Sequence, residues 1–382
     1  MDFYYDGTLR GKGVKMRISL VSVQLGMGGA ENLVCNLADR FVARGHEVQL
    51  ISLLGEPVVV PKSSHVTIHN LRIIKKNPAS WLSGIYYFSR AIKNFKPDVV
   101  HAHSFHSIIL ARLMRPILNY PKLISTGHNQ REGEGVQGKI YKLTDRLSDV
   151  MTNISLESTD ALNTRLNIRK KAITVYNGID SDVFRFSSNG RSSLRKELDI
   201  DDGEKLLVAI GRLNPQKDYP NLIEALKIIE KKNPTSNIKV AIIGDGDISY
   251  KRELRQMVGD KLSRTQVNFL GIRRDIPDCL SAADIFVLSS AWEGFGLVVA
   301  EAMSCERVVV ATDAGGVREV VGDAGFICPP QNAEALATAL TQAMSLSVPE
   351  AEALGKKARD RVVQNFSLDA AVDRWLELYT RI

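Results

Sequence analysis

Cysteines and long apolar runs are both scarce in this sequence. Its four cysteines, Cys35, Cys279, Cys305 and Cys328, lie far apart and form no C-x-x-C pair. This spacing argues against a disulfide scaffold or a zinc ribbon and favours a reducing compartment. No segment approaches the roughly 20 apolar residues of a membrane-spanning helix, and the polar N-terminus has no apolar segment of the kind that secretory signals carry. We therefore expect a cytoplasmic protein.

The overall composition is that of a folded globular protein. Hydrophobic residues make up 44% of the chain and charged residues 24%, a balance that excludes disordered and collagen-like classes. A length of 382 residues predicts two or three domains.

Positive charge is concentrated in the N-terminal half. Residues 1–185 carry 25 Lys and Arg against 15 Asp and Glu, a net +10, whereas residues 186–382 carry 25 against 28, a net −3. A basic half indicates an anionic partner such as a nucleic acid, phospholipid headgroups or a phosphorylated acceptor. A basic surface that only keeps the protein in solution explains the charge equally well.

Two segments of this half mix apolar and basic residues. Residues 81–96 combine aromatic side chains with Arg90, Lys93 and Lys96, and residues 105–118 form an apolar run with Arg112 and Arg115. Basic amphipathic helices can lie on an anionic membrane surface, here the inner face of the cytoplasmic membrane. Helices packed on a sheet with their cations reaching solvent fit at least as well. No pattern of a DNA- or RNA-binding motif is present, so we expect no nucleic-acid partner.

The N-terminal half alternates predicted strands and helices. A strand over residues 17–23, a glycine-rich turn at 26–29, a helix over 30–44 and a strand over 46–53 form a βαβ unit, which is typical of a parallel sheet. Further strands are predicted at residues 97–102, 123–126, 149–154 and 172–176, and further helices at 140–148 and 159–166.

A second series of the same kind follows residue 204. Its predicted strands are 206–211, 238–243, 267–270, 284–288 and 308–311, and its predicted helices are 219–231, 250–262, 276–282, 297–303, 334–345 and 351–364. Residues 185–204 are polar and are interpreted as a connector. The fold class is therefore α/β, with two Rossmann-like parallel-sheet domains facing an interdomain cleft, a usual place for ligands.

These patterns predict four parts of the chain. A polar extension is expected at residues 1–15, a first domain for the acceptor at 16–184 and a second domain for the donor at 185–365. A C-terminal helix at 366–382 is expected to pack back on the first domain.

The strongest functional pattern is WEGFGLVVAEA at residues 292–302. A turn with two glycines joins a strand to a helix, so the backbone N–H groups of Phe295, Gly296 and Leu297 would lie at a helix N-terminus. Such amides and the positive end of the helix dipole favour a phosphate. Glu293 before the helix could accept sugar hydroxyls, and Glu301 within it could reach a ribose diol. Isolated glutamates at this spacing would usually be solvated surface residues.

A second pattern is GRLNPQKD at residues 211–218, directly after the first strand of the second domain. In a doubly wound sheet this end of the strand faces the ligand crevice. Arg212 and Lys217 would be two cations suited to a diphosphate, the first by bidentate pairing and the second as a compact charge. Two ordinary surface cations are an equally good interpretation of this segment taken alone.

Histidines cluster at residues 101, 103 and 106, with His128 beyond them. An H-x-H pair can bind zinc, but no Cys, Asp or Glu completes a ligand set nearby. We expect His101 to be partly buried at a strand end and His103 and His106 to lie near an acceptor.

Taken together, these motifs resemble the retaining glycosyltransferases of family four, which have the GT-B fold and build bacterial polysaccharides and lipid-linked glycans. The resemblance begins at Arg17 and covers nearly all of the chain that follows. The segments that carry it are residues 28–31 (GGAE), 98–103 (DVVHAH), 126–128 (TGH), 177–180 (NGID), 211–213 (GRL), 244–246 (GDG) and 293–301.

The resemblance implies a role for each candidate residue. Arg212 and Lys217 would contact the donor diphosphate, Glu301 the ribose, and Glu293 with the amides that follow it the donor sugar. Gly28 and Gly29 would lie across the cleft from the donor phosphates, and His128 would hydrogen-bond the sugar near the reacting centre. A plain βα turn and a structural loop histidine remain the alternatives for these last two sites.

The resemblance also implies the reaction. A sugar would move from a nucleoside-diphosphate sugar, most often a UDP-sugar, to a hydroxyl of a glycan or lipid-linked acceptor without a metal ion or other cofactor. The departing phosphate would take the acceptor proton. Lipopolysaccharide, other surface polysaccharides or glycoconjugates are the expected products. A nucleotide-sugar epimerase of the same fold and a non-catalytic nucleotide-sugar-binding scaffold are the competing functions.

Overall fold

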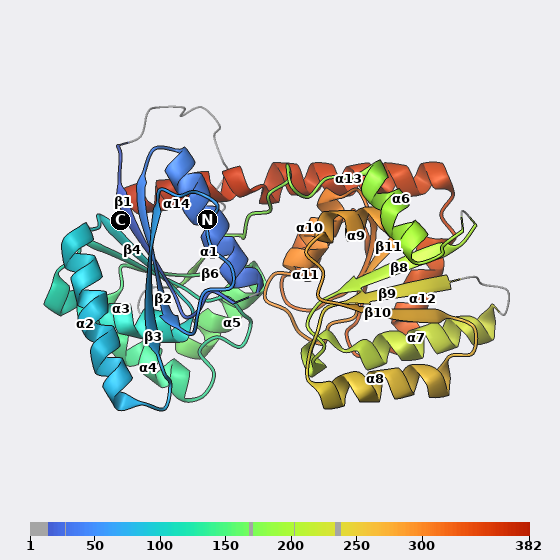
Figure 1. Cartoon of the computed structure of the whole chain (residues 1–382), viewed down its shortest axis with the longest axis horizontal. Coiled ribbons are helices and arrows are strands. Elements are labelled where there is room, and N and C mark those ends of the chain that lie inside the picture. Colours follow the sequence, from blue (N-terminus) through green and yellow to red (C-terminus); the bar gives the residue numbers. More distant parts are fainter. Residues whose placement is uncertain (1–13, 27, 168–170, 202, 234–237) are drawn as a thin grey trace. The chain divides into compact units, whose positions relative to one another are not determined.

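The protein forms two parallel sheets with helices on their faces (Figure 1). The computed structural model describes residues 14–26, 28–167, 171–201, 203–233 and 238–382. Most of the predicted N-terminal extension, and Met27 of the first glycine-rich turn, lie outside these residues. The predicted α/β class with two Rossmann-like domains is confirmed, and the cleft between the domains stays a prediction.

The first sheet has the strand order β3-β2-β1-β4-β5-β6-β7. Its strands are β1 (Arg17–Ser22), β2 (Glu47–Leu54), β3 (Val66–Ile73), β4 (Val99–His103), β5 (Lys122–Thr126), β6 (Val150–Asn153) and β7 (Ile173–Thr174). The accompanying helices are α1 (Gly29–Ala43), α2 (Pro78–Phe95), α3 (Phe105–Leu118), α4 (Val136–Thr144), the short η1 (Asp145–Leu147) and α5 (Leu156–Leu166).

The second sheet has the order β10-β9-β8-β11-β12-β13, and all five neighbouring pairs are parallel. Its strands are β8 (Lys205–Ile210), β9 (Ile238–Ile243), β10 (Gln266–Gly271), β11 (Ile285–Leu288), β12 (Val308–Thr312) and β13 (Phe326–Cys328). Its helices are α6 (Ser188–Glu197), η2 (Pro215–Lys217), α7 (Tyr219–Lys232), α8 (Ile248–Lys261), α9 (Ile276–Ala282), α10 (Leu297–Ser304), α11 (Val317–Val321), α12 (Ala333–Met344), α13 (Val348–Phe366) and α14 (Leu368–Arg381).

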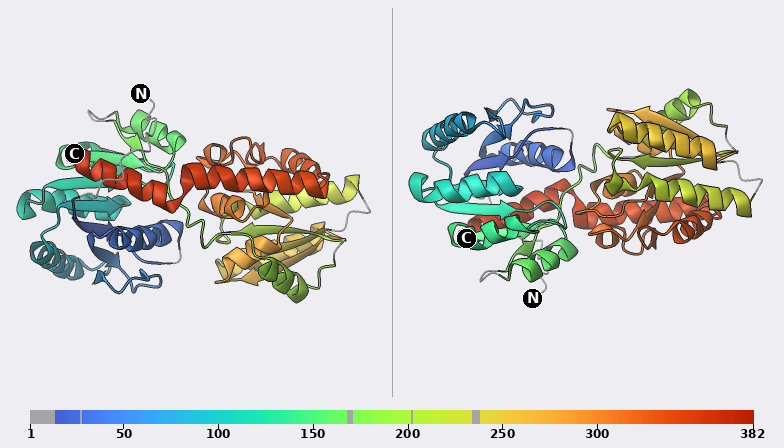
Figure 2. Two further views of the ribbon diagram at one scale, coloured as in Figure 1. Left: turned by 90° about the horizontal axis from the view of Figure 1, so that it is seen from above. Right: turned by 90° about the horizontal axis from the view of Figure 1, so that it is seen from below.

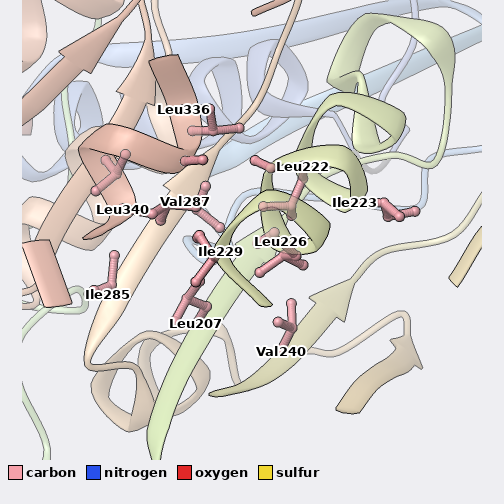
Figure 3. Close-up of a cluster of buried hydrophobic side chains, with 14 of the residues drawn as sticks. Leu207, Leu222, Ile223, Leu226, Ile229, Val240, Ile285, Val287, Leu336 and Leu340 are labelled. Carbon is pink, nitrogen blue, oxygen red and sulfur yellow. The ribbon is translucent and has the colours of Figure 1, made fainter. Parts of the chain in front are cut away.

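The core of the second sheet follows from the two-residue period of its strands. In β8, Leu207 packs into one hydrophobic cluster and its neighbours Leu206 and Val208 into another, on the opposite face. The first cluster holds α7 and α12 against the sheet through Leu222, Leu226 and Leu336 among others (Figure 3). Strands β8, β9, β11 and β12 are buried and mostly apolar, which is why the sequence predicted them well. Helices lie over both faces of this sheet (Figure 2).

The chain divides into two compact units that do not coincide with the sheets. The first comprises the described residues up to Ile124 together with Leu147–Asp149, and the second comprises Ser125–Arg146 and Val150–Ile382. The predicted domain limits, and the packing of the C-terminal helix on the first domain, stay predictions. None of the described helices is long and apolar enough to cross a membrane.

Residues 185–204, interpreted from the sequence as a connector, contain helix α6, which the sequence did not predict. The Ser187 hydroxyl caps this helix by accepting a hydrogen bond from the Gly190 N–H at 3.0 Å. Arg191 and Arg195 both pair with Asp284, at 2.6 and 3.0 Å. Leu194 is the only apolar side chain of this helix and packs into a core cluster, so the sequence shows no stripe of apolar residues, and the two ion pairs add to this contact.

Two strands at sheet edges were also missed. Strand β3 lies at one edge of the first sheet and has three exposed residues among its eight, and β13 at the edge of the second has only three residues. Because β3 is not buried on both faces, it has no continuous apolar run that the sequence could show.

Candidate functional site

The candidate site lies where β8 and β11 end, at the centre of the second sheet. These adjacent parallel strands mark the point at which the strand order reverses, where ligands bind in open α/β sheets. The turn at residues 211–218 follows β8, and the loop at residues 289–296 follows β11. The Ala291 N–H donates to the Gln216 carbonyl at 2.8 Å, so the two segments meet directly.

A buried ion pair joins these two segments. The Lys217 ammonium lies 2.6 Å from Oε1 of Glu293, and their side chains are only 15% and 10% exposed. The Ser290 hydroxyl donates to the same carboxylate oxygen at 2.7 Å, and the Gln216 amide lies 3.5 Å from Oε2. Oε2 of Glu293 therefore has fewer and longer hydrogen bonds than Oε1. The structure thus brings together two residues that the sequence assigned to one site.

Gly211 provides the space that the lysine occupies. A Cβ atom built on Gly211 would lie 2.5 Å from Cε and 2.9 Å from Cδ of Lys217. The lysine side chain therefore crosses the bare backbone of the strand end on its way to Glu293. A residue with a side chain at position 211 would compete with Lys217 for the same volume.

Glu301 lies on α10, and its electrostatic interaction with Lys217 places it in the same neighbourhood. Burial raises the pKa of its carboxyl group to about 7, and the positive charge of Lys217 opposes this rise. Since burial disfavours the charged form, this carboxyl group is half protonated near neutral pH.

The predicted helix start after Glu293 is confirmed. Helix α10 begins at Leu297, with Gly296 as its N-cap at φ +85° and no side chain capping the first turn. The first turn holds no acidic residue, so the amides at this end are not neutralised locally. The Phe295 ring is buried and packs against Tyr176 and Phe366, which anchors the turn in the core.

The loop that carries Glu293 is packed against Ser155, Ser158 and Gly315. The carbonyl of Gly294 accepts hydrogen bonds from the hydroxyls of Ser155 and Ser158, at 2.9 and 3.3 Å. Gly315 has φ +59°, and a Cβ atom there would lie 2.1 Å from the Glu293 carbonyl oxygen. Sequence reasoning missed Gln216, Ser290 and Gly315. The Gly315-Gly316 pair after β12 was the one signal that could have indicated this support.

Arg212 takes no part in the ion pair. It is exposed and makes no hydrogen bond or ion pair with any other residue that the structure describes. Leu213 next to it bonds through its N–H to the Asp245 carbonyl at 2.9 Å. A hollow of about 220 Å³ opens beside this turn, with Asp245, Lys251 and Phe269 among its lining residues.

His128 follows β5 and approaches the Glu293 loop through its backbone. A Cβ atom on Gly294 would lie 2.7 Å from the His128 carbonyl oxygen, so only a glycine allows this contact. Burial lowers the pKa of the His128 imidazole to about 4. The imidazole is therefore neutral at physiological pH and suited to hydrogen bonding rather than to carrying charge.

The remaining candidates belong to the first compact unit. Gly28 is the N-cap of α1 and Gly29 its first residue. His103 ends β4, is 1% exposed and stacks on His101 at 3.9 Å between ring centroids. His101 is fully buried rather than partly buried as expected. His106 lies in the first turn of α3, and burial, followed by the charge of Lys75, lowers its pKa.

Zinc binding by the histidine cluster finds no support. Among the residues that the structure describes, no group of three or more His, Cys, Asp or Glu side chains is placed to hold a metal ion.

Two family models match this chain. The one described as "Glycosyl transferases group 1" matches residues 190–361, and the one described as "Glycosyltransferase Family 4" matches residues 27–183. Together they account for most of the sequence.

Known proteins resemble the chain over nearly its whole length. The N-acetyl-alpha-D-glucosaminyl L-malate synthase of Bacillus anthracis is 25% identical over 92% of this chain and 94% of its own. The UDP-Gal:alpha-D-GlcNAc-diphosphoundecaprenol alpha-1,3-galactosyltransferase of Escherichia coli is 26% identical over 76% and 77%. The crystal structure of Anabaena Alr3699/HepE with UDP and glucose has the same fold, with a TM-score of 0.80 at 20% identity, covering 96% of this chain and 100% of its own.

Proposed function

Because this chain is an enzyme of the family-four glycosyltransferases with the GT-B fold, we propose that it transfers a sugar from a nucleoside-diphosphate sugar to a hydroxyl of a glycan or lipid-linked acceptor, with retention of anomeric configuration. The buried pair of Lys217 and Glu293 at the ends of β8 and β11 carries the assignment. The Escherichia coli relative, named for UDP-Gal, and the structural neighbour, solved with UDP and glucose, favour a UDP-sugar. We place the product in surface polysaccharide or glycoconjugate biosynthesis.

The site has the charges that departure of a diphosphate needs. The bond between the anomeric carbon and the phosphate oxygen breaks, and negative charge grows on the departing diphosphate. Lys217, Arg212 and the free amides of α10 are the groups that would stabilise this charge. The new bond from the acceptor oxygen forms on the same face, and the acceptor proton passes to the departing phosphate.

Glu293 has two roles in this proposal. One carboxylate oxygen holds the Lys217 ammonium in place, together with the Ser290 hydroxyl. The other accepts hydroxyls of the donor sugar. The neutral imidazole of His128 hydrogen-bonds the sugar near the reacting carbon. The roles of Gly28, Gly29, His103 and His106, which lie in the first compact unit, stay predictions.

The decisive experiment is an incubation with UDP-, GDP- and ADP-sugars in the presence and absence of candidate acceptors. We expect nucleoside diphosphate to be released, and proton NMR to show the same anomeric configuration in product and donor. An epimerised donor without acceptor would indicate the competing epimerase. Binding of the donor, seen as a thermal shift, without release or transfer would indicate a scaffold.

The ionisation of Glu301 predicts how donor binding depends on pH. A carboxylate accepts two ribose hydroxyls, and protonation removes one acceptor, so affinity should rise as the pH passes the Glu301 pKa of about 7. For a single group we expect about tenfold tighter binding at pH 8 than at pH 6. Calorimetry with a nucleotide sugar measures this, because its diphosphate does not titrate in that range.

Glu301→Gln is the matched control, since it keeps the shape and cannot ionise. The variant should bind the donor with the same affinity at both pH values. An equally strong pH dependence in the variant would assign the effect to another group.

We also propose that helix α2 contacts an anionic membrane surface. Leu82, Tyr86 and Tyr87 on this helix are 72%, 60% and 51% exposed, and the exposed Arg90 and Lys93 follow them along the same helix. Exposed apolar side chains flanked by cations are typical of helices that lie in a membrane interface.

Sedimentation with vesicles tests this contact. Leu82→Glu with Tyr86→Glu should lower the bound fraction several-fold on vesicles with anionic lipid, and high salt should weaken binding of the unchanged protein. Val348→Glu on α13 is the control, because Val348 is 67% exposed but lies outside the proposed surface. Equal binding of all variants would contradict the proposal.

A further inference from the structure

A buried glutamate that the proposed chemistry does not use lies beneath the loop that carries His128. Glu132 is 3% exposed. Its carboxylate accepts hydrogen bonds from the Tyr141 hydroxyl at 2.5 Å and the Asn129 amide at 3.1 Å, and also from the backbone N–H of His128. Two of these three donors belong to the loop itself, and the third comes from α4.

The carboxylate is enclosed tightly. A Cβ atom on Gly127 would lie 2.8 Å from Cγ of Glu132, and the Tyr141 side chain is fully buried. The Arg165 guanidinium donates to the carbonyls of Gln130 and Glu132. Tyr141 of α4 and Arg165 of α5 therefore hold residues 128–132 in place through hydrogen bonds.

The upper side of the same loop touches the Glu293 segment. A Cβ atom on Gly294 would lie 2.7 Å from the His128 carbonyl oxygen and 3.3 Å from the Asn129 Cα. Any movement of this loop would therefore change the distance between His128 and the residue that follows Glu293.

We propose that Glu132 and Tyr141 are positioning residues, which hold the His128 loop against Gly294 so that His128 meets the donor sugar in a reactive geometry. The inference rests on the proposed function of His128. Burying a carboxyl group costs free energy that an apolar side chain would avoid. The Glu132 carboxylate accepts a hydrogen bond from the backbone N–H of His128, which lies in a loop outside both sheets. An apolar residue at position 132 could not accept this hydrogen bond.

Tyr141→Phe is the sharpest test, because it removes one hydroxyl and leaves the ring in place. We expect kcat to fall about 10- to 100-fold, since displacement of a reacting group by about 1 Å can cost that much. The donor KM and the affinity for nucleoside diphosphate should stay within threefold of the unchanged enzyme, because Lys217 and Glu301 are not disturbed. Glu132→Gln should act in the same direction.

Two controls separate positioning from general stability. Tyr120→Phe removes another buried tyrosine hydroxyl, which donates to the Ala111 carbonyl, and should leave kcat unchanged. In a His128→Ala background, Tyr141→Phe should have no further effect on kcat, because the residue through which it acts is gone. An equal loss in both backgrounds, or full activity of Tyr141→Phe, would overturn the inference.

Hydrogen exchange gives a readout that needs no substrate. Tyr141→Phe should speed exchange of the amides in the peptide covering residues 127–135, and unchanged exchange would overturn the inference by itself. A wild-type protein without transferase activity would contradict the proposed function instead. An active wild-type enzyme whose variants keep full kcat would contradict only the role of Glu132 and Tyr141.

Discussion

Lys217→Ala should lower turnover about 10²- to 10³-fold, the usual loss when one group that stabilises developing charge is removed. The Lys217 ammonium is the cation that lies 2.6 Å from Glu293 at the ends of β8 and β11. The substitution removes the positive charge that would stabilise the departing diphosphate. It also removes the ion-pair partner of the Glu293 carboxylate, which can then change its orientation. Steady-state release of nucleoside diphosphate measures the effect.

A second buried lysine provides the matched control. Lys239 pairs with Glu204 at 2.9 Å, and these side chains are 14% and 11% exposed, close to the 15% and 10% of Lys217 and Glu293. Lys239 lies at the start of β9, at the opposite end of the sheet from the site. Both alanine variants should lose stability, but only Lys217→Ala should lose turnover. Turnover of Lys217→Ala within fivefold of the unchanged enzyme would refute the assignment.

Gly211→Ala should reduce kcat/KM about 10- to 100-fold, and it should lower the melting temperature by no more than Lys217→Ala does. The added methyl group would lie 2.5 Å from Cε of Lys217. The end of a lysine side chain can move without shifting the backbone, but it then leaves Glu293 and the buried ion pair is lost. Differential scanning fluorimetry and initial-rate kinetics on the same preparation separate the two effects.

Gly244→Ala is the informative contrast. At this position φ is +138°, and the added Cβ would lie 2.0 Å from the backbone carbonyl oxygen of Gly211. The backbone cannot move aside as a side chain can, so this variant should lose stability first. Gly211→Ala with full activity would show that Lys217 has another route to the diphosphate.

The two predictions concern one physical arrangement. Lys217 and Glu293 lie 76 residues apart in sequence, and each follows a strand at the point where the sheet order reverses. The positive charge and its anchoring carboxylate are therefore held by segments that follow two adjacent strands at the centre of the sheet. A site built this way is pre-organised for the charge that develops during transfer.

The apolar runs predicted β8, β9, β11 and β12 closely, because these strands are buried on both faces. They did not predict α6, whose only apolar side chain, Leu194, makes no apolar stripe. They also did not predict β3, whose three exposed residues leave no continuous apolar run.

The site also contains residues that the sequence predicted and residues that it missed. Strand ends and glycine-containing turns in the sequence indicated Lys217, Glu293 and Glu301 as neighbours. Ser290 and Gln216 gave no signal, because a serine or glutamine in a polar loop looks the same whether or not it faces a carboxylate. Glu132 was missed because its sequence neighbours do not show that it is buried. Its partner Tyr141 lies nine residues away on α4 and contacts it only in the folded structure.

The motifs that resemble the family-four glycosyltransferases were enough to identify the family, and the order of apolar and polar residues was enough to predict two parallel-sheet domains. Such a pattern reports which residues must leave water, and that requirement is local to each strand and helix. Only the tertiary structure decided that Lys217 pairs with Glu293 across Gly211, and that burial raises the pKa of Glu301 to about 7. The ion pair and the raised pKa depend on how closely distant segments approach each other and how much water they exclude. Neither quantity can be obtained from the spacing of residues along the chain.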